Sequence, residues 1–261
     1  MPNILTLHQI EQRKEKLTDE EYREFVTLKK ELNNHEWSEV LDHLRTLNRS
    51  NYIVDENYNA LITEVRNYTS SEYLIGSNKL DDSAMDILRH LSNFVVSSKN
   101  REEHLLDHVI PRLEELRPEI ELRKAHDKKT KQLNNLLTLG PFFKDLRTVF
   151  VHDFPSALSG NEQGEMRDGT ITMEREIGVK TEKLLQSDKW SSSSKCIINE
   201  NSRDGGLPLE QLIVDYYTSM ESLYEWFEDY VMTEFEDIYF DGIHLAAILE
   251  RKQNRYLFGE N

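Results

Sequence analysis

Apolar residues recur at helical intervals along most of this chain, and this periodicity restricts the fold more than any other feature. The clearest case follows Thr18, which has the S/T-x-x-E spacing of a capping box with Glu21, so residues 18–33 are predicted to form a helix. Six prolines and ten glycines in 261 residues favour long helices over a sandwich of short strands. The other predicted helices cover residues 38–48, 55–75, 82–110, 119–138, 141–153, 207–235 and 241–256.

Prolines and glycines predict where some of these helices end. Pro111 and Pro118 predict a kink or a break between residues 110 and 118. Gly140-Pro141 predicts the end of one helix and the start of the next, since glycine is favoured after a helix and proline at its first position.

Residues 155–206 differ in composition from the helical segments, with clusters of Gly, Ser and Asn. The alternation in 170–174 predicts a small β-hairpin. Trp190 and the pair Ile197-Ile198 have apolar surface to bury, so this region is expected to be an insertion that packs on the helices rather than a disordered linker.

The predicted fold class is therefore all-α, a helical bundle with a small irregular insertion, with a β-hairpin, around residues 155–206. An N-terminal helical segment, 1–80, is expected to pack on a bundle formed by 81–240. Residues 241–261 are expected to form a C-terminal helix and tail, with all three segments in one compact unit.

Composition excludes several classes of protein. The single cysteine, Cys196, excludes an internal disulfide framework and a Cys/His zinc site. No apolar run approaches 18 residues and the N-terminus has no cleavable signal pattern, so a cytoplasmic protein without a membrane partner is expected. A net charge of −16 disfavours a broad nucleic-acid groove, although it leaves room for a small, locally basic site.

The segment 141–155, PFFKDLRTVFVHDFP, is the place where the sequence indicates chemistry rather than packing. It places Arg147 five positions before His152 near the end of an apolar helix, and Pro155 stops that helix. A cation and an imidazole together can cleave a phosphodiester. Five positions correspond to about 140° around the helix axis, so the two side chains need a second wall, which a symmetric dimer would supply.

Three segments resemble the HEPN superfamily of helical, nucleic-acid-related proteins, and the resemblance extends over roughly residues 83–235. They are 85–94 (MDILRHLSNF), 101–104 (REEH) and 146–152 (LRTVFVH). The resemblance implies a dimerising helical bundle and a metal-independent ribonuclease, without a cofactor, in a toxin–antitoxin or phage-defence system. The partners it implies are RNA, a second copy of the chain and an antitoxin or another protein.

The positions that match the family motif are Arg147 and His152. The resemblance implies attack by the RNA's own 2′-hydroxyl, with His152 as general acid or base and Arg147 stabilising charge on the phosphorane. Thr148, about one turn before His152, or Asp153 would orient the imidazole. Arg89 and Asn93 are four positions apart on another predicted helix. They are expected either to support the site together from that helix or to be ordinary polar surface residues.

Other interpretations remain open for these residues. Because the family often has Asn, Asp or His where this chain has Thr148, the alternative function is a non-catalytic interaction or regulatory module that binds a protein partner. Arg147 would then form an ion pair with Asp145 or a neighbouring acid, and His152 would cap the helix. A small-ligand or nucleotide-binding bundle is a third option, but no Gly-rich phosphate loop supports it.

Two histidines outside this segment, His104 and His108, have the i, i+4 spacing of two metal ligands, but the sequence offers no third ligand. No metal site is therefore expected. The loose Arg-to-His spacing recurs between Arg101 and His108, where it is interpreted as chance.

Overall fold

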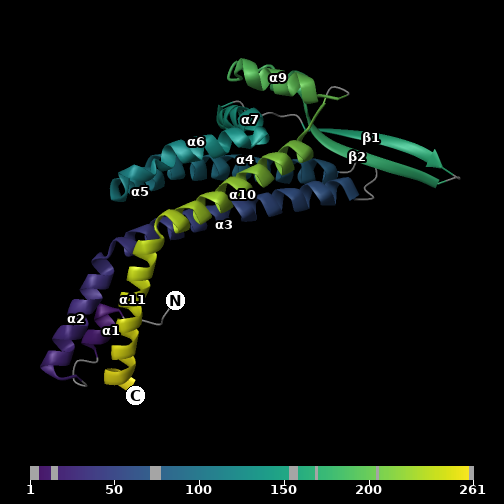
Figure 1. Cartoon of the computed structure of the whole chain (residues 1–261). Helices are drawn as coiled ribbons and strands as arrows, with labels where there is room; N and C mark the ends of the chain where they lie inside the picture. Colours follow the sequence, from purple (N-terminus) through teal and green to yellow (C-terminus); the bar gives the residue numbers. More distant parts are fainter. Residues whose placement is uncertain are drawn as a thin grey trace. The chain divides into compact units, whose positions relative to one another are not determined.

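The computed structural model describes residues 6–12, 17–70, 78–152, 158–167, 170–203 and 206–258, and it confirms the all-α prediction (Figure 1). The helices are α1 (Leu7–Glu11), α2 (Asp19–Asn34), α3 (Glu36–Ser70), α4 (Asn78–His104), α5 (Ile110–Leu116), α6 (Leu122–Gln132), α7 (Asn134–His152), α8 (Thr181–Leu184), α9 (Ser192–Asn201), α10 (Leu209–Glu234) and α11 (Glu236–Gln253). Leu105–Val109 and Asn254–Phe258 are π-helical turns, η2 and η4, and Pro118–Ile120 is a 3₁₀ turn, η3. In the described part of the chain, no helix combines the length and the apolarity that a membrane crossing requires.

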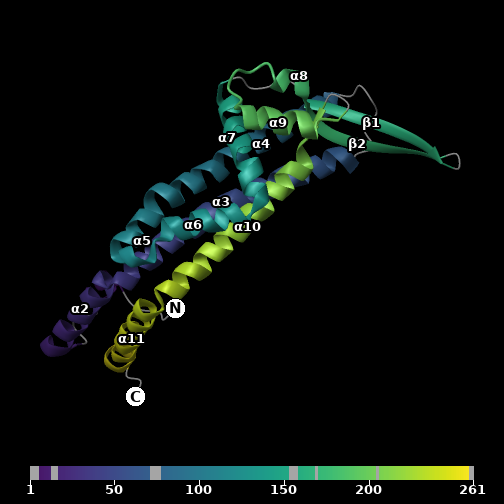
Figure 2. The same cartoon turned by 45° about the horizontal axis from the view of Figure 1, so that its top comes forward.

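The predicted hairpin is confirmed and is longer than the sequence indicated. Strand β1 (Leu158–Arg167) pairs antiparallel with β2 (Thr170–Lys180), with Leu158 opposite Val179 and Arg167 opposite Thr170. A short strand, β3 (Gly206–Pro208), pairs antiparallel with the end of β2, which gives the order β1-β2-β3. The β1–β2 ribbon extends away from the neighbouring helices in both views (Figures 1 and 2).

Three helix predictions from the sequence are wrong. The helix expected at 119–138 is interrupted at Leu133, where α6 ends and α7 begins. The helices expected at 38–48 and 55–75 are one continuous helix, α3, since the residues between them include no proline or glycine and Val54 is buried. Gly140-Pro141 does not separate two helices, because Pro141 lies inside α7. Burial of Phe142 and Phe143 directly after the proline offsets the backbone hydrogen bond that proline cannot make.

The helix break expected between residues 110 and 118 is present. The chain widens into the π-helical turn η2 just before this proline, whose ring would otherwise clash with the carbonyl four residues earlier. The helix then ends at Leu116, and one residue, Arg117, separates it from the 3₁₀ turn that begins at Pro118.

The chain divides into two compact units. Unit 1 comprises Met1–Thr46, Arg112–Ile120 and Phe227–Asn261, and unit 2 comprises Leu47–Pro111 and Glu121–Trp226. The division expected from the sequence (1–80, 81–240 and 241–261) stays a prediction.

The core of unit 2 is rich in aromatic rings. Phe143 stacks on Tyr216 with ring centroids 4.2 Å apart, and Phe94 meets both rings edge to face. Trp190 stacks on Phe142 and donates a hydrogen bond from Nε1 to the carbonyl of Leu184. The part of the insertion that follows the ribbon, residues 181–201, is therefore packed on the helices, as predicted for Trp190, Ile197 and Ile198, and all three of these side chains are buried.

Unit 1 contains a close approach between α3 and α11. A β-carbon built on Gly242 would lie 2.5 Å from Cδ1 of the Trp37 indole, which is buried against the ring of Tyr239. A rigid aromatic ring cannot move away as a flexible side chain can, so this position requires glycine.

We expect Gly242→Ala to lower the free energy of unfolding by about 1–3 kcal/mol, because the added methyl group overpacks the contact with Trp37. Gly140→Ala is the control: it lies inside α7, and apart from its chain neighbours and its own helix backbone nothing lies within 4 Å of the added carbon, so the change should be smaller than at Gly242, with the helical preference for alanine opposed by the following Pro141. Urea unfolding of both variants measures the difference. Equal effects of the two substitutions would contradict the close approach.

Candidate functional site

Arg147 lies on α7 and reaches across to α4. Its Nη1 donates to Glu103 Oε1 at 3.2 Å, and its Nη2 donates to Asn100 Oδ1 at 3.2 Å. The side chain is 32% exposed, although its neighbour Leu146 is fully buried. The guanidinium is thus held at the edge of the core, in an ion pair with a neighbouring acid.

Asp145 was an expected partner of Arg147, but it has a different role. Its Oδ2 accepts hydrogen bonds from the Ser191 backbone N–H at 2.9 Å and from the Ser194 hydroxyl at 2.7 Å, at the start of α9. Burial works to raise the pKa of Asp145, but these hydrogen bonds outweigh burial, so the pKa is lowered. This carboxylate therefore joins α7 to α9.

For His152, the second residue of the predicted Arg147–His152 pair, the structure describes only the backbone. His152 is the last residue of α7, and its side chain lies outside the described residues, as does the whole of Asp153. Thr148 donates its hydroxyl to the carbonyl of Lys144, one turn earlier in the same helix. The proposed roles of Thr148 and Asp153 in orienting His152 stay predictions.

α4 does supply contacts to the helix of Arg147, but from residues other than those expected. Arg89 forms an ion pair with Asp86 on its own helix and Asn93 is exposed. The residues of α4 that hold Arg147 begin at Asn100, about 16 Å further along the helix than Arg89. A supporting role of Arg89 and Asn93 stays a prediction.

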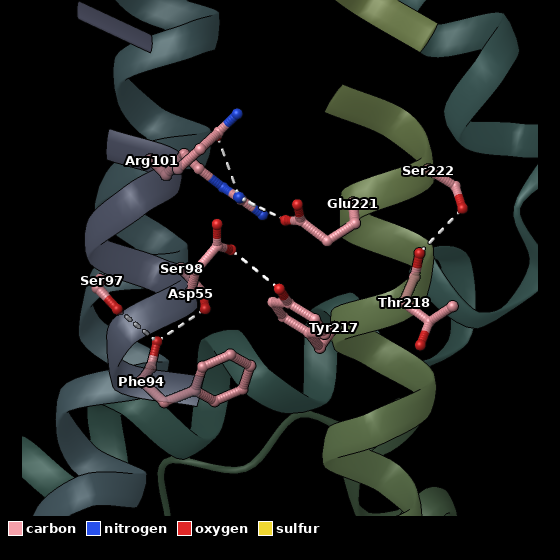
Figure 3. Close-up of polar contacts among 10 residues, drawn as sticks. Asp55, Phe94, Ser97, Ser98, Arg101, Tyr217, Thr218, Glu221 and Ser222 are labelled. Carbon is pink, nitrogen blue, oxygen red and sulfur yellow. Dashed lines mark hydrogen bonds and ion pairs between the residues drawn. The ribbon is translucent and has the colours of Figure 1, made fainter. Parts of the chain in front are cut away.

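A buried polar cluster joins α3, α4 and α10 in unit 2 (Figure 3). At its centre is Arg101, which is 1% exposed. Its Nη1 donates to Glu221 Oε1 at 2.8 Å and to Asn51 Oδ1 at 3.1 Å, and its guanidinium carbon lies 3.8 Å from the ring centroid of Tyr224. Burial raises the pKa of Glu221 despite the opposing effect of Arg101.

A second contact between α3 and α10 extends this cluster. The hydroxyl of Tyr217 donates to Asp55 Oδ1 at 3.0 Å, and the Tyr217 ring stacks on Tyr58 with centroids 3.6 Å apart (Figure 3). Burial raises the pKa of Tyr217, and the bond to Asp55 acts in the same direction. The phenol is therefore neutral and remains a hydrogen-bond donor at physiological pH.

Sequence reasoning missed the importance of this cluster, since Arg101 and Glu221 are 120 positions apart and share no local spacing. It also missed a basic helix, α6, whose Lys and Arg density was visible in the sequence. The rings of His104 and His108, the pair with the spacing of two metal ligands, have centroids 5.4 Å apart. No group of three potential metal ligands occurs among the residues that the structure describes.

Comparison of the chain with known proteins does not assign it to a family. No protein-family model matches the chain, and neither curated proteins nor solved structures give a match.

We expect Arg101→Met to lower the free energy of unfolding by about 3 kcal/mol, because it leaves the carboxylate of Glu221 without its buried partner. Adding Glu221→Leu should recover part of the loss, since no uncompensated charge then remains. Arg112→Met is the control: its ion pair with Glu115 is exposed, so the change should be within about 1 kcal/mol. A loss as small for Arg101 as for Arg112, in urea unfolding, would contradict this account.

His126 on α6 makes stability depend on pH. Its side chain is buried, and burial lowers the pKa of the imidazole although Asp127 and Glu102 oppose the shift. The folded protein therefore holds the ring neutral, whereas the unfolded chain binds a proton below about pH 6.5. Stability from this group is fully present above that pH and is lost as the pH falls below it.

We expect His126→Leu to reduce the loss of unfolding free energy between neutral pH and mildly acidic pH, because the variant has no ring to protonate. Urea unfolding at several pH values measures the slope for both proteins. His108→Leu is the control, since His108 is exposed. If the wild type and His126→Leu lose stability in parallel, the buried imidazole is not the source.

Proposed function

We propose that this chain is a metal-independent endoribonuclease in which Arg147 and His152 act together. The orientation of Arg147 is the observation that supports the proposal best. Its guanidinium is held by Asn100 and Glu103 at the edge of the core, and it is partly open to solvent. A guanidinium that is already oriented loses less freedom when it binds a phosphate.

The chemistry would use the RNA's own 2′-hydroxyl. Its oxygen bonds to phosphorus while the bond to the 5′-oxygen breaks, which leaves a cyclic phosphate and a free 5′-hydroxyl. A histidine side chain, which ordinarily titrates near pH 6.5, is suited to take the proton from the nucleophile or to give one to the leaving oxygen. Arg147 would stabilise the charge that develops on the phosphorane.

A dimer is part of this proposal. Arg147 and His152 are both on α7, and five positions correspond to about 140° around the axis. A second copy of α7 across a two-fold axis would bring the arginine of one subunit towards the histidine of the other. The resemblance to the HEPN superfamily adds a role as toxin or phage-defence effector, with an antitoxin or another protein as partner.

One observation favours a second candidate function, a non-catalytic helical module that binds a protein partner. Glu103 already occupies Arg147 with a negative charge, and a phosphate would compete with this carboxylate. The net charge of −16 also works against RNA binding over most of the surface.

We expect the wild type to cleave RNA in the presence of EDTA, and Arg147→Ala and His152→Ala each to lower the rate at least about 100-fold. Arg147→Lys should restore only part of the activity, because an ammonium group cannot form two parallel hydrogen bonds to a phosphate. Arg112→Ala, which also removes an exposed arginine from an ion pair, should cleave at the wild-type rate.

Cleavage products with a cyclic phosphate, detected by mass spectrometry, would agree with attack by the 2′-hydroxyl. Equal rates for the wild type and His152→Ala would end the catalytic proposal and leave the interaction module.

A further inference from the structure

The helix α6 is basic in an otherwise acidic chain. Its eleven residues, LRKAHDKKTKQ, include five Lys or Arg and one Asp, a net charge of +4. Since the whole chain has a net charge of −16, the other 250 residues together have −20. α6 therefore has a net positive charge, whereas the rest of the chain has a net negative one.

Most of these cations share one exposed face. Arg123, Lys124, Lys128 and Lys131 are exposed and fall within an arc of about 140° around the helix axis. The opposite side of α6 buries Leu122 and His126. These four cations, here called the α6 basic face, span eight positions, which is about 12 Å along the helix.

Few carboxylates offset this charge. Lys124 forms an ion pair with Glu121, but both side chains are largely exposed, and such pairs contribute little. Asp127, the acid of the same helix, is exposed and lies within the same arc as the four cations, and its carboxylate is 3.7 Å from the buried ring of His126. The face therefore keeps a net positive charge towards solvent.

The α6 basic face and Arg147 are anchored to one stretch of helix. Arg123 donates from Nη1 to the carbonyl of Leu106 in η2 at 2.7 Å. Arg147 is held by Glu103, three residues before Leu106, a rise of about 4.5 Å. α6 also packs against α7, which carries Arg147.

We propose that the α6 basic face binds the phosphate backbone of single-stranded RNA and places it along the junction of α4 and η2. Lysine ammonium groups on flexible stems tolerate variable phosphate positions, which suits a backbone read without regard to sequence. Because the rest of the chain is acidic, a polyanion has few other places to bind. The binding does not require cleavage; the choice of RNA as the polyanion and its direction towards Arg147 rest on the proposed function.

The test measures the affinity of a fluorescent oligouridylate by anisotropy at several KCl concentrations. Lys128→Ala combined with Lys131→Ala should reduce the slope of log K against log salt by about 1.4, that is about 0.7 for each lost phosphate contact. If the affinity extrapolated to 1 M salt is the same for both proteins, this change in slope corresponds to about 25-fold weaker binding by the variant at about 0.1 M KCl.

Two control variants isolate the position of the charge. Arg23→Ala combined with Lys30→Ala removes the same charge from exposed positions of α2 and should leave the slope unchanged. Lys128→Arg combined with Lys131→Arg keeps the charge and should bind like the wild type. Circular dichroism checks that each variant is folded. An unchanged slope in the α6 alanine variant would overturn the proposal.

Two further measurements separate this inference from its rivals. Polyglutamate that binds the wild type as tightly as the oligouridylate would point to an acidic protein and overturn an RNA site. Binding measured with Arg147→Ala/His152→Ala separates docking from cleavage. If Arg147→Ala/His152→Ala binds RNA through α6 but neither it nor the wild type cleaves RNA, the ribonuclease proposal fails and the RNA-binding face stands. If the wild type cleaves RNA and the α6 substitutions do not change the rate, the RNA-binding face fails and the ribonuclease proposal stands.

Discussion

The burial of Arg101 determines how the helices of unit 2 meet. Its charge lies in the core, where it is compensated by Glu221, by Asn51 and by the face of Tyr224. A misaligned α3 or α10 would leave a charge uncompensated in a medium of low dielectric constant, which costs several kcal/mol. The contact therefore favours the alignment of α3, α4 and α10 that brings Asn51 and Glu221 to the guanidinium.

The candidate site depends on the same alignment. Asn100, which directly precedes Arg101 on α4, and Glu103, two positions after it, hold Arg147. A helix turns about 100° per residue, so fixing Arg101 inward fixes the direction in which the residues beside it point. The orientation of the surface arginine is thus set by a buried one.

The sequence predicted what local physics decides. The capping box of Thr18 and Glu21, the hairpin and the burial of Trp190 follow from neighbouring residues, and all three are present. The failures were at places where tertiary contacts override local preference. Pro141 stays inside α7 because the phenylalanines that follow it are buried in the core of unit 2.

The candidate site was harder to predict for the same reason. The sequence indicated Arg147, but its partners are 44 and 47 positions away, and no periodicity links them. An acid two positions before Arg147, Asp145, was one expected partner, yet it caps the start of α9 instead. Local spacing identifies residues with chemical potential, whereas the core decides which of them meet.

The distribution of charge resolves the apparent conflict between an acidic chain and the proposed binding of RNA. Charges act over about 8 Å at physiological ionic strength, a distance shorter than the α6 basic face itself. A phosphate in contact with Lys128 therefore responds to its immediate neighbours, and most of the distant negative charge is screened. That negative charge still repels RNA from the rest of the surface, so net charge restricts where a polyanion binds rather than whether it binds.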